Sequence, residues 1–167
     1  MSDPDDYLSQ EYLHLQSVVE DFDGRALTVK AWSVTFSATA IGFAYANKIP
    51  AILLVAAISA FSFWIVEALV KVNQQAHYGR IRTIERHFAR RRNTKPFQIG
   101  ASWDRAFDKN RKFRRIFAVA RWPHVFMPHI VIIALATGLW LFAKPGQEAG
   151  HFLQADIGGI RISTPPR

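Results

Sequence analysis

Four titratable residues lie within or at the edges of long apolar stretches: Lys30, Glu67, His124 and His129. Ionisable groups in such positions are costly unless paired, so each is a candidate site residue. Lys30 and Glu67 lie near the same end of two successive stretches, which favours an ion pair between them. The alternative is that Glu67 contributes to a ring of charge at the mouth of an oligomeric pore.

The two histidines are five residues apart, so they are poorly aligned on one helical face. A proton relay or a metal site could use His124 and His129 in principle. The favoured interpretation is that they face neighbouring helices or lie at an interface, because lone titratable groups are rare inside membranes.

Catalytic motifs are missing from the chain. It has no cysteine, which excludes disulfides, thiol catalysis and cysteine-based metal sites. It has no glycine-rich phosphate loop, no H-E-x-x-H and no G-x-S-x-G. His77 and Glu85 could share one helical face loosely, although a solvated face explains them better. The sequence therefore predicts a non-enzymatic protein with no catalytic residues, no cofactor and no metal site.

Three apolar stretches must position these residues: 31–46, 49–70 and 125–142. A helix needs about 20 apolar residues to cross a bilayer. The second stretch carries only Glu67, and residues 122–142 carry no formal charge. The first has only 16 uncharged residues, and lengthening it includes Lys30, whose amine can extend to the headgroups. The prediction is an all-α integral membrane protein with three transmembrane helices and a cytoplasmic helical layer.

The charge distribution orients these spans. Residues 71–121 hold 15 of the 21 Lys and Arg residues and three acids, whereas residues 1–25 hold seven acids and one Arg. Basic residues gather in short cytoplasmic loops. We therefore expect a multi-pass protein of the bacterial inner (plasma) membrane, with the N-terminus and the 71–121 loop cytoplasmic and the C-terminus external. The acidic N-terminus does not resemble a secretory signal.

Turn residues and tryptophans support this topology. Residues 47–50, Asn-Lys-Ile-Pro, predict a tight turn that makes the first two spans a hairpin. Trp122 and Trp140 are 18 residues apart, about 27 Å along a helix, which matches the two interfaces of a bilayer.

Small residues recur at fourfold spacing in all three spans and predict close helix packing, either within the chain or between copies in a homo-oligomer. They are Ala38, Gly42 and Ala46, then Ala56 and Ala60, then Ala134 and Gly138. Hydroxyl residues in the same spans, such as Ser33 and Ser37, are expected to bond to helix carbonyls or across helices.

The acidic N-terminal segment carries an apolar stripe with spacings 4, 3, 4, 3: Leu8, Tyr12, Leu15, Val19 and Phe22. We expect a helix capped by Ser2 or Asp3 and ended by Asp23-Gly24.

A complementary stripe follows the second span, on a helix that should run unbroken from Pro50 to about Asn93: His77, Ile81, Ile84 and Phe88. Basic residues, Arg80 among them, are expected on the rest of that helix surface. The two stripes predict that the acidic and basic helices pack together.

Residues 103–121 predict one basic amphipathic helix in which aromatic and basic residues alternate, which suits an anionic leaflet. Nucleic acid is the alternative partner and is disfavoured, because no recognised motif accompanies the charge. The basic cytoplasmic patch comprises Arg90, Arg91, Arg92, Arg111, Lys112, Arg114 and Arg115.

The predicted divisions are therefore five. Residues 1–25 form an acidic cytoplasmic amphipathic helix and 26–70 a transmembrane hairpin. Residues 71–121 form a basic cytoplasmic helical loop, 122–143 the third span and 144–167 an external irregular tail.

This order of parts resembles small bacterial membrane proteins of the SLATT type. The likeness covers residues 7–92: the segment E-D-F-D-G-R-A-L-T-V-K-A-W at 20–32, the turn at 47–50 and the helical extension at 74–87. The resemblance implies a pore-forming role in nucleotide-signalled defence. The third span and the large basic loop depart from the two-span pattern.

The functional expectation is a small membrane protein that self-associates as a homo-oligomer, in its sharpest form a pore or an effector. The alternative is an accessory subunit of a larger membrane complex. A weaker alternative is a membrane-tethered binder of nucleic acid or anionic lipid. The expected partners are the lipid bilayer, anionic lipids and further copies of the chain.

Overall fold

The computed structural model describes residues 3–90, 93–110 and 113–143. These residues form five helices and no strand, which confirms the all-α class. The helices are α1 (Pro4–Asn47), α2 (Ala51–Arg90), α3 (Ile99–Asn110), α4 (Phe113–Ala120) and α5 (Pro123–Phe142).

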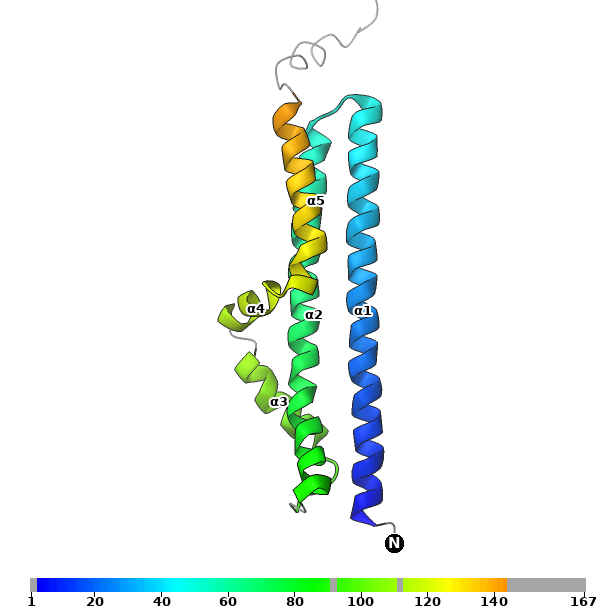
Figure 1. The fold of residues 1–167 in the computed structure, drawn as a ribbon, viewed down its shortest axis with the longest axis vertical. Coiled ribbons are helices and arrows are strands. Elements are labelled where there is room, and N and C mark those ends of the chain that lie inside the picture. The colour runs from blue at the N-terminus through cyan, green and yellow to red at the C-terminus, as the bar shows by residue number, and fades with distance from the viewer. Residues whose placement is uncertain (1–2, 91–92, 111–112, 144–167) are drawn as a thin grey trace, which may run out of the picture.

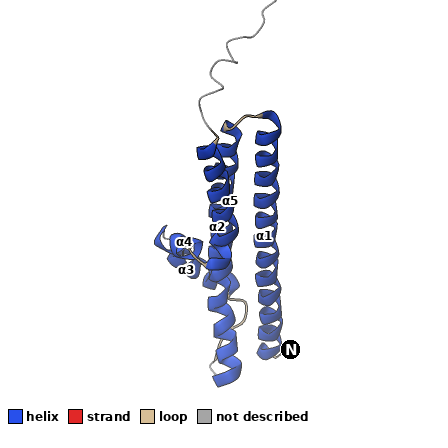
Figure 2. Ribbon diagram, turned by 45° about the horizontal axis from the view of Figure 1, so that its top comes forward, coloured by secondary structure: helices blue, strands red, loops and turns tan. Residues whose placement is uncertain are grey.

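Two long antiparallel helices, α1 and α2, form the axis of the molecule (Figure 1). The tight turn that joins them marks one end, called here the turn end, and the start of α1 marks the N-terminal end. Helix α5 lies beside the turn-end half of α2, and α3 and α4 lie beside its other half (Figures 1 and 2).

Helix α1 is continuous over 44 residues, so the expected break at Asp23-Gly24 and the separate 1–25 helix are wrong. A glycine inside a helix costs only about 1 kcal/mol relative to alanine. Packing against α2 on both sides of Gly24 outweighs that cost. The expected cap is Asp3, whose carboxylate accepts a hydrogen bond from Asp5 N at 3.2 Å.

The predicted turn between the first two helices is present and uses a left-handed residue. Lys48 has a φ of 56°, and its N–H donates to Tyr45 O at 3.3 Å. The next N–H, of Ile49, donates to Ala44 O at 3.0 Å. These bonds satisfy the last carbonyls of α1 and reverse the chain within a few residues.

Helix α2 runs unbroken for 40 residues, about 60 Å, as predicted, and Gly79 does not interrupt it. Two helices, α2 and α5, are long and apolar enough to cross a membrane. Helix α1 is not one of these two, because its uncharged stretch is shorter and contains several Ser and Thr residues.

The predicted pairing of the two stripes forms the core at the N-terminal end. Leu8, Leu15 and Val19 of α1 pack against Ile81 and Ile84 of α2 in one buried cluster. Two residues of α2 differ from the prediction. Phe88, expected in the apolar stripe, is 48% exposed, and Arg80, expected on the surface, is only 4% exposed.

The core at the turn end is built from small residues, with Ala40 of α1, Ala56 of α2 and Ala136 of α5 in one cluster. Ala56 and Ala60 are fully buried, as a close-packing ridge requires. The α1 ridge of Ala38, Gly42 and Ala46 is exposed instead. Helix α1 packs through the buried side chains of Ser33, Ser37, Ala40 and Ala44.

The single helix expected over 103–121 is wrong, because the segment forms two helices, α3 and α4. Helix α3 begins earlier, at Ile99, which packs against the N-terminal-end core. Helix α4 is held near the start of α5 by buried Val119 and by the Trp64 Nε1–H, which donates to Ala120 O at 2.8 Å. One straight helix could not satisfy both attachments.

Some predicted features lie outside the described residues and are not placed. They are the 144–167 tail and four members of the basic patch: Arg91, Arg92, Arg111 and Lys112.

Candidate functional site

Three helices meet at a buried polar group, called here the Glu67 cluster: Lys30, Ser33, Glu67 and His129. Glu67 Oε1 lies 3.1 Å from Lys30 Nζ, and Glu67 Oε2 lies 3.0 Å from His129 Nε2. His129 Nδ1 lies 2.9 Å from Ser33 Oγ. Side chains of α1, α2 and α5 are thereby joined in one chain of contacts.

Burial differs along the Glu67 cluster. Ser33, Glu67 and His129 are fully buried, whereas the Lys30 side chain is 22% exposed. The contact of Lys30 with Glu67 Oε1 has the distance of an ion pair but not the geometry of a hydrogen bond. The contact is therefore electrostatic, and the ammonium keeps access to the surface of the helix pair.

Hydrogen-bonding roles follow from the partners. An ionised Glu67 only accepts, so the proton of a neutral His129 sits on Nε2, and Nδ1 accepts from the Ser33 hydroxyl. The positive charge of Lys30 and the negative charge of Glu67 then balance. Buried groups paired in this way hold helices in one register, because any other register would leave a charge or a donor unpaired.

The predicted Lys30–Glu67 pair is thus present, and His129 faces the bundle as the favoured interpretation held. Sequence reasoning did not connect His129 or Ser33 to the pair. Ser33 follows Lys30 by three residues and so shares its helical face, which was the available signal. Glu67 is enclosed by helices of its own chain, so a pore-mouth ring would require these helices to separate.

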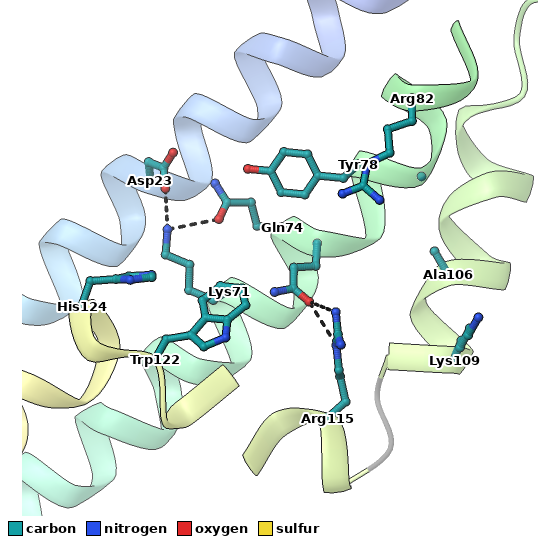
Figure 3. Close-up of a pocket in the computed structure, with 12 residues that line it drawn as sticks. Asp23, Lys71, Gln74, Tyr78, Arg82, Ala106, Lys109, Arg115, Trp122 and His124 are labelled. Carbon is teal, nitrogen blue, oxygen red and sulfur yellow. Dashed lines mark hydrogen bonds and ion pairs between the residues drawn. The ribbon is translucent and has the colours of Figure 1, made fainter. Parts of the chain in front are cut away.

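A second polar site, called here the basic cavity, has a volume of about 760 Å³ and lies between α2 and the segment from α3 to the start of α5 (Figure 3). Its charged lining consists of Asp23, Lys71, Arg82, Lys109 and Arg115. Tyr78, Trp122 and His124 also line it, together with Gln74 and Gln75. His124 is therefore exposed to this cavity, 5.4 Å from the Trp122 ring between ring centres.

Among the described residues that line the basic cavity, the one carboxylate, Asp23, is already engaged. Lys71 Nζ donates to Asp23 Oδ1 and, at 3.1 Å, to Gln74 Oε1. The Lys71 hydrogen bond, and secondly Gln74, hold the pKa of Asp23 below its usual value. Gln74 Nε2 in turn donates to Val19 O at 2.9 Å, which ties the site to α1.

A buried ion pair at the N-terminal end was not predicted. Arg80 Nε and Nη2 donate to Glu11 Oε1 and Oε2 at 2.7 and 2.9 Å, and both side chains are 5% exposed. Glu11 Oε2 also accepts from Phe97 N at 3.0 Å, and Arg80 donates to Lys95 O at 2.9 Å. The pair therefore fastens the segment before α3 to the helix hairpin.

Of the remaining predicted site residues that the structure describes, Trp122 and Arg115 line the basic cavity, whereas Trp140, Arg90 and Arg114 do not. Trp122 immediately precedes α5 and Trp140 lies in its last turn, both partly buried. Arg90 and Arg114 are exposed, and Arg115 lines the basic cavity. Within the described ranges, no group of three His, Asp or Glu side chains could hold a metal ion.

Comparison of the chain with family models, with curated proteins and with solved structures finds no match. The likeness to SLATT-type proteins is therefore a hypothesis about arrangement alone.

Proposed function

We propose that the protein is a non-enzymatic integral membrane protein with three spans that acts by self-association. The basic residues near the ends of the apolar helices favour an inner-membrane orientation with α3, α4 and the N-terminus cytoplasmic. In that orientation, the Glu67 cluster lies near the cytoplasmic boundary and locks the three spans into one unit. The unit that associates would be this whole bundle.

The observation that carries the proposal is the outer face of α1. Ala38, Gly42 and Ala46 are exposed, and at 100° per residue they lie opposite the packed face of Ser33, Ser37, Ala40 and Ala44. Outside the adjacent backbone of α1 itself, a Cβ added at Gly42 would meet no described atom within 4 Å. The chain therefore contains a close-packing surface that none of the described helices covers.

The polarity of α1 supplies a second reason for a partner. Of α1, α2 and α5, only α1 is not apolar enough over a membrane-spanning length. It also exposes Thr35 and Thr39 beside the ridge of small residues. Within lipid, helices associate by close backbone approach and by polar contacts rather than by the hydrophobic effect. A second copy packed on this ridge in a two-fold arrangement would provide both.

Cysteine crosslinking tests this interface cleanly, because the chain has no cysteine of its own. We expect Ala38→Cys and Gly42→Cys to form disulfide-linked dimers in oxidised membranes. Phe43→Cys is the matched control, since residue 43 is also exposed but lies about 100° around the helix from Gly42. Equal crosslinking at all three positions, or at none of them, would contradict the proposed interface.

The sharper version of the proposal is a pore or an effector. Glu67 is closed within one chain, so such a pore would have to be lined by another surface or would need the Glu67 cluster to open. Conductance in liposomes would support this version. A protein that stays monomeric at every detergent ratio would contradict both the pore and the self-association.

A second candidate function is that of an accessory subunit, favoured by an apolar surface at the N-terminal end. Tyr12, Leu13 and Phe88 line a cavity of about 670 Å³, and the Leu13 side chain is 67% exposed. Phe88 lies about 30 Å beyond Glu67 along α2, outside the apolar stretch that lipid could cover. This role predicts a stoichiometric protein partner that Leu13→Glu displaces and that Gly42→Leu leaves bound.

A further inference from the structure

We propose that the basic cavity binds a phosphate group, carried either by a lipid headgroup or by a soluble phosphoanion. The cavity lies apart from the outer face of α1, so this inference goes beyond self-association. Its support comes from the charge, the donor geometry and the position of the lining residues.

The charge of the lining is unbalanced. Among the described lining residues, four cations, Lys71, Arg82, Lys109 and Arg115, share the cavity with one carboxylate, that of Asp23. Lys71 already pairs with that carboxylate. Within the described residues, no acidic side chain forms an ion pair with the other three cations, so the cavity keeps an excess of positive charge that an anion would compensate.

The uncompensated cations come from three different helices: Arg82 from α2, Lys109 from α3 and Arg115 from α4 (Figure 3). Arg115 Nε and Nη2 donate at 3.2 and 2.8 Å to Gln75 Oε1, a neutral acceptor that leaves its charge unpaired. A guanidinium presents a planar fork of donors that matches a phosphate, and two such groups with a lysine suit a doubly charged anion.

The position of the basic cavity favours the headgroup as the source. Lys71 directly follows the apolar stretch of α2, and Trp122 and His124 flank the first residue of α5. The cavity therefore lies where the apolar stretch of α2 ends and where α5 begins, and these are the two helices apolar enough to cross a membrane. Basic pockets between spans on the cytoplasmic side suit phospholipid headgroups, and Trp and Tyr are typical of this level.

The test compares two double variants of the full chain with equal change in net charge. Arg82→Gln with Arg115→Gln removes two cations from the basic cavity. Arg105→Gln with Arg114→Gln removes two exposed cations of α3 and α4 that do not line it. Binding is measured with phosphatidylglycerol against phosphatidylcholine by native mass spectrometry, and with inorganic phosphate and pyrophosphate by calorimetry.

We expect the cavity variant to bind the anionic probe about 30-fold more weakly and the control variant to bind it within about threefold of the wild type. Retention of phosphatidylglycerol without competition by phosphate identifies the headgroup as ligand. Binding of phosphate or pyrophosphate in lipid-free detergent, lost in the cavity variant, identifies a soluble phosphoanion.

Two results would overturn the site: equal weakening in both variants, which indicates non-specific charge attraction, or no binding of any probe by the wild type. Gly42→Leu should not alter this binding. Failure of the dimer interface and failure of the anion site can therefore be told apart.

Discussion

Replacing Glu67 by Gln tests whether the Glu67 cluster holds the three long helices together. The substitution keeps the shape of the side chain and an oxygen that can accept from His129 Nε2. It removes the charge that faces Lys30 Nζ at 3.1 Å and presents an amide donor to an ammonium donor. The Lys30 ammonium would then lie against buried helix surface without a counter-charge.

The magnitude follows from the burial of the two partners. Breaking a fully buried ion pair by removing one partner costs about 3–5 kcal/mol. Lys30 is 22% exposed and can turn toward water, so we expect about 2–3 kcal/mol of lost unfolding free energy for Glu67→Gln. Lys30→Met should cost at least as much, because it leaves the fully buried Glu67 carboxylate without its ammonium partner.

The assay is a double-mutant cycle on reversible unfolding in detergent, followed by far-ultraviolet circular dichroism. Lys30→Met combined with Glu67→Gln removes both charges and should recover about 2 kcal/mol relative to the sum of the single variants. Glu85→Gln is the matched control, an exposed carboxylate on the same helix, with an expected change within about 0.5 kcal/mol. If Glu67→Gln behaves like this control, the cluster does not hold the bundle together.

Four further outcomes are expected. Glu11→Ala should lower the free energy of unfolding by about 3–5 kcal/mol in the same assay, because it leaves the buried Arg80 guanidinium and the N–H of Phe97 without their carboxylate partner. The double variant Glu11→Ala with Arg80→Met should recover much of that loss. Burial, and to a lesser extent the charge of His14, lower the pKa of His77, so near pH 6.5 the unfolded chain binds a proton that the folded chain does not. The free energy of unfolding should therefore fall as the pH drops below 6.5, and His77→Gln should flatten that part of the plot of stability against pH. Gly42→Leu should yield monomers with unchanged circular dichroism while Phe43→Leu stays associated, and equal masses for the two variants would contradict the α1 interface. Reporter fusions at residues 100 and 167 should report opposite sides of the membrane, and a cytoplasmic residue 167 would exclude three spans.

Much of the fold could be predicted from local patterns. The apolar stripes of α1 and α2, whose residues are spaced alternately by four and three, pack against each other as predicted. The turn between α1 and α2 lies at the predicted Asn-Lys-Ile-Pro segment. The break at Gly24 was predicted wrongly, because a glycine is a weak local signal and packing on α2 outweighs it. The division of 103–121 into two helices was missed because separate attachments to α2 cause it, and neither attachment is visible in the periodicity.

The sequence alone determined the all-α class of the described residues and predicted which segments are apolar, acidic or basic. Apolar runs of helical length, a basic segment between them and a Lys–Glu pair at matching depth follow from short-range spacing, which a linear chain displays directly. Tertiary structure alone decided the partners of the other charged and titratable side chains. His129 lies 62 residues from Glu67, Arg80 lies 69 residues from Glu11, and the basic cavity collects side chains from all five helices. Such contacts depend on how each helix is rotated about its own axis. That rotation is set by the packing of all the helix faces together, and no single segment of the sequence specifies it.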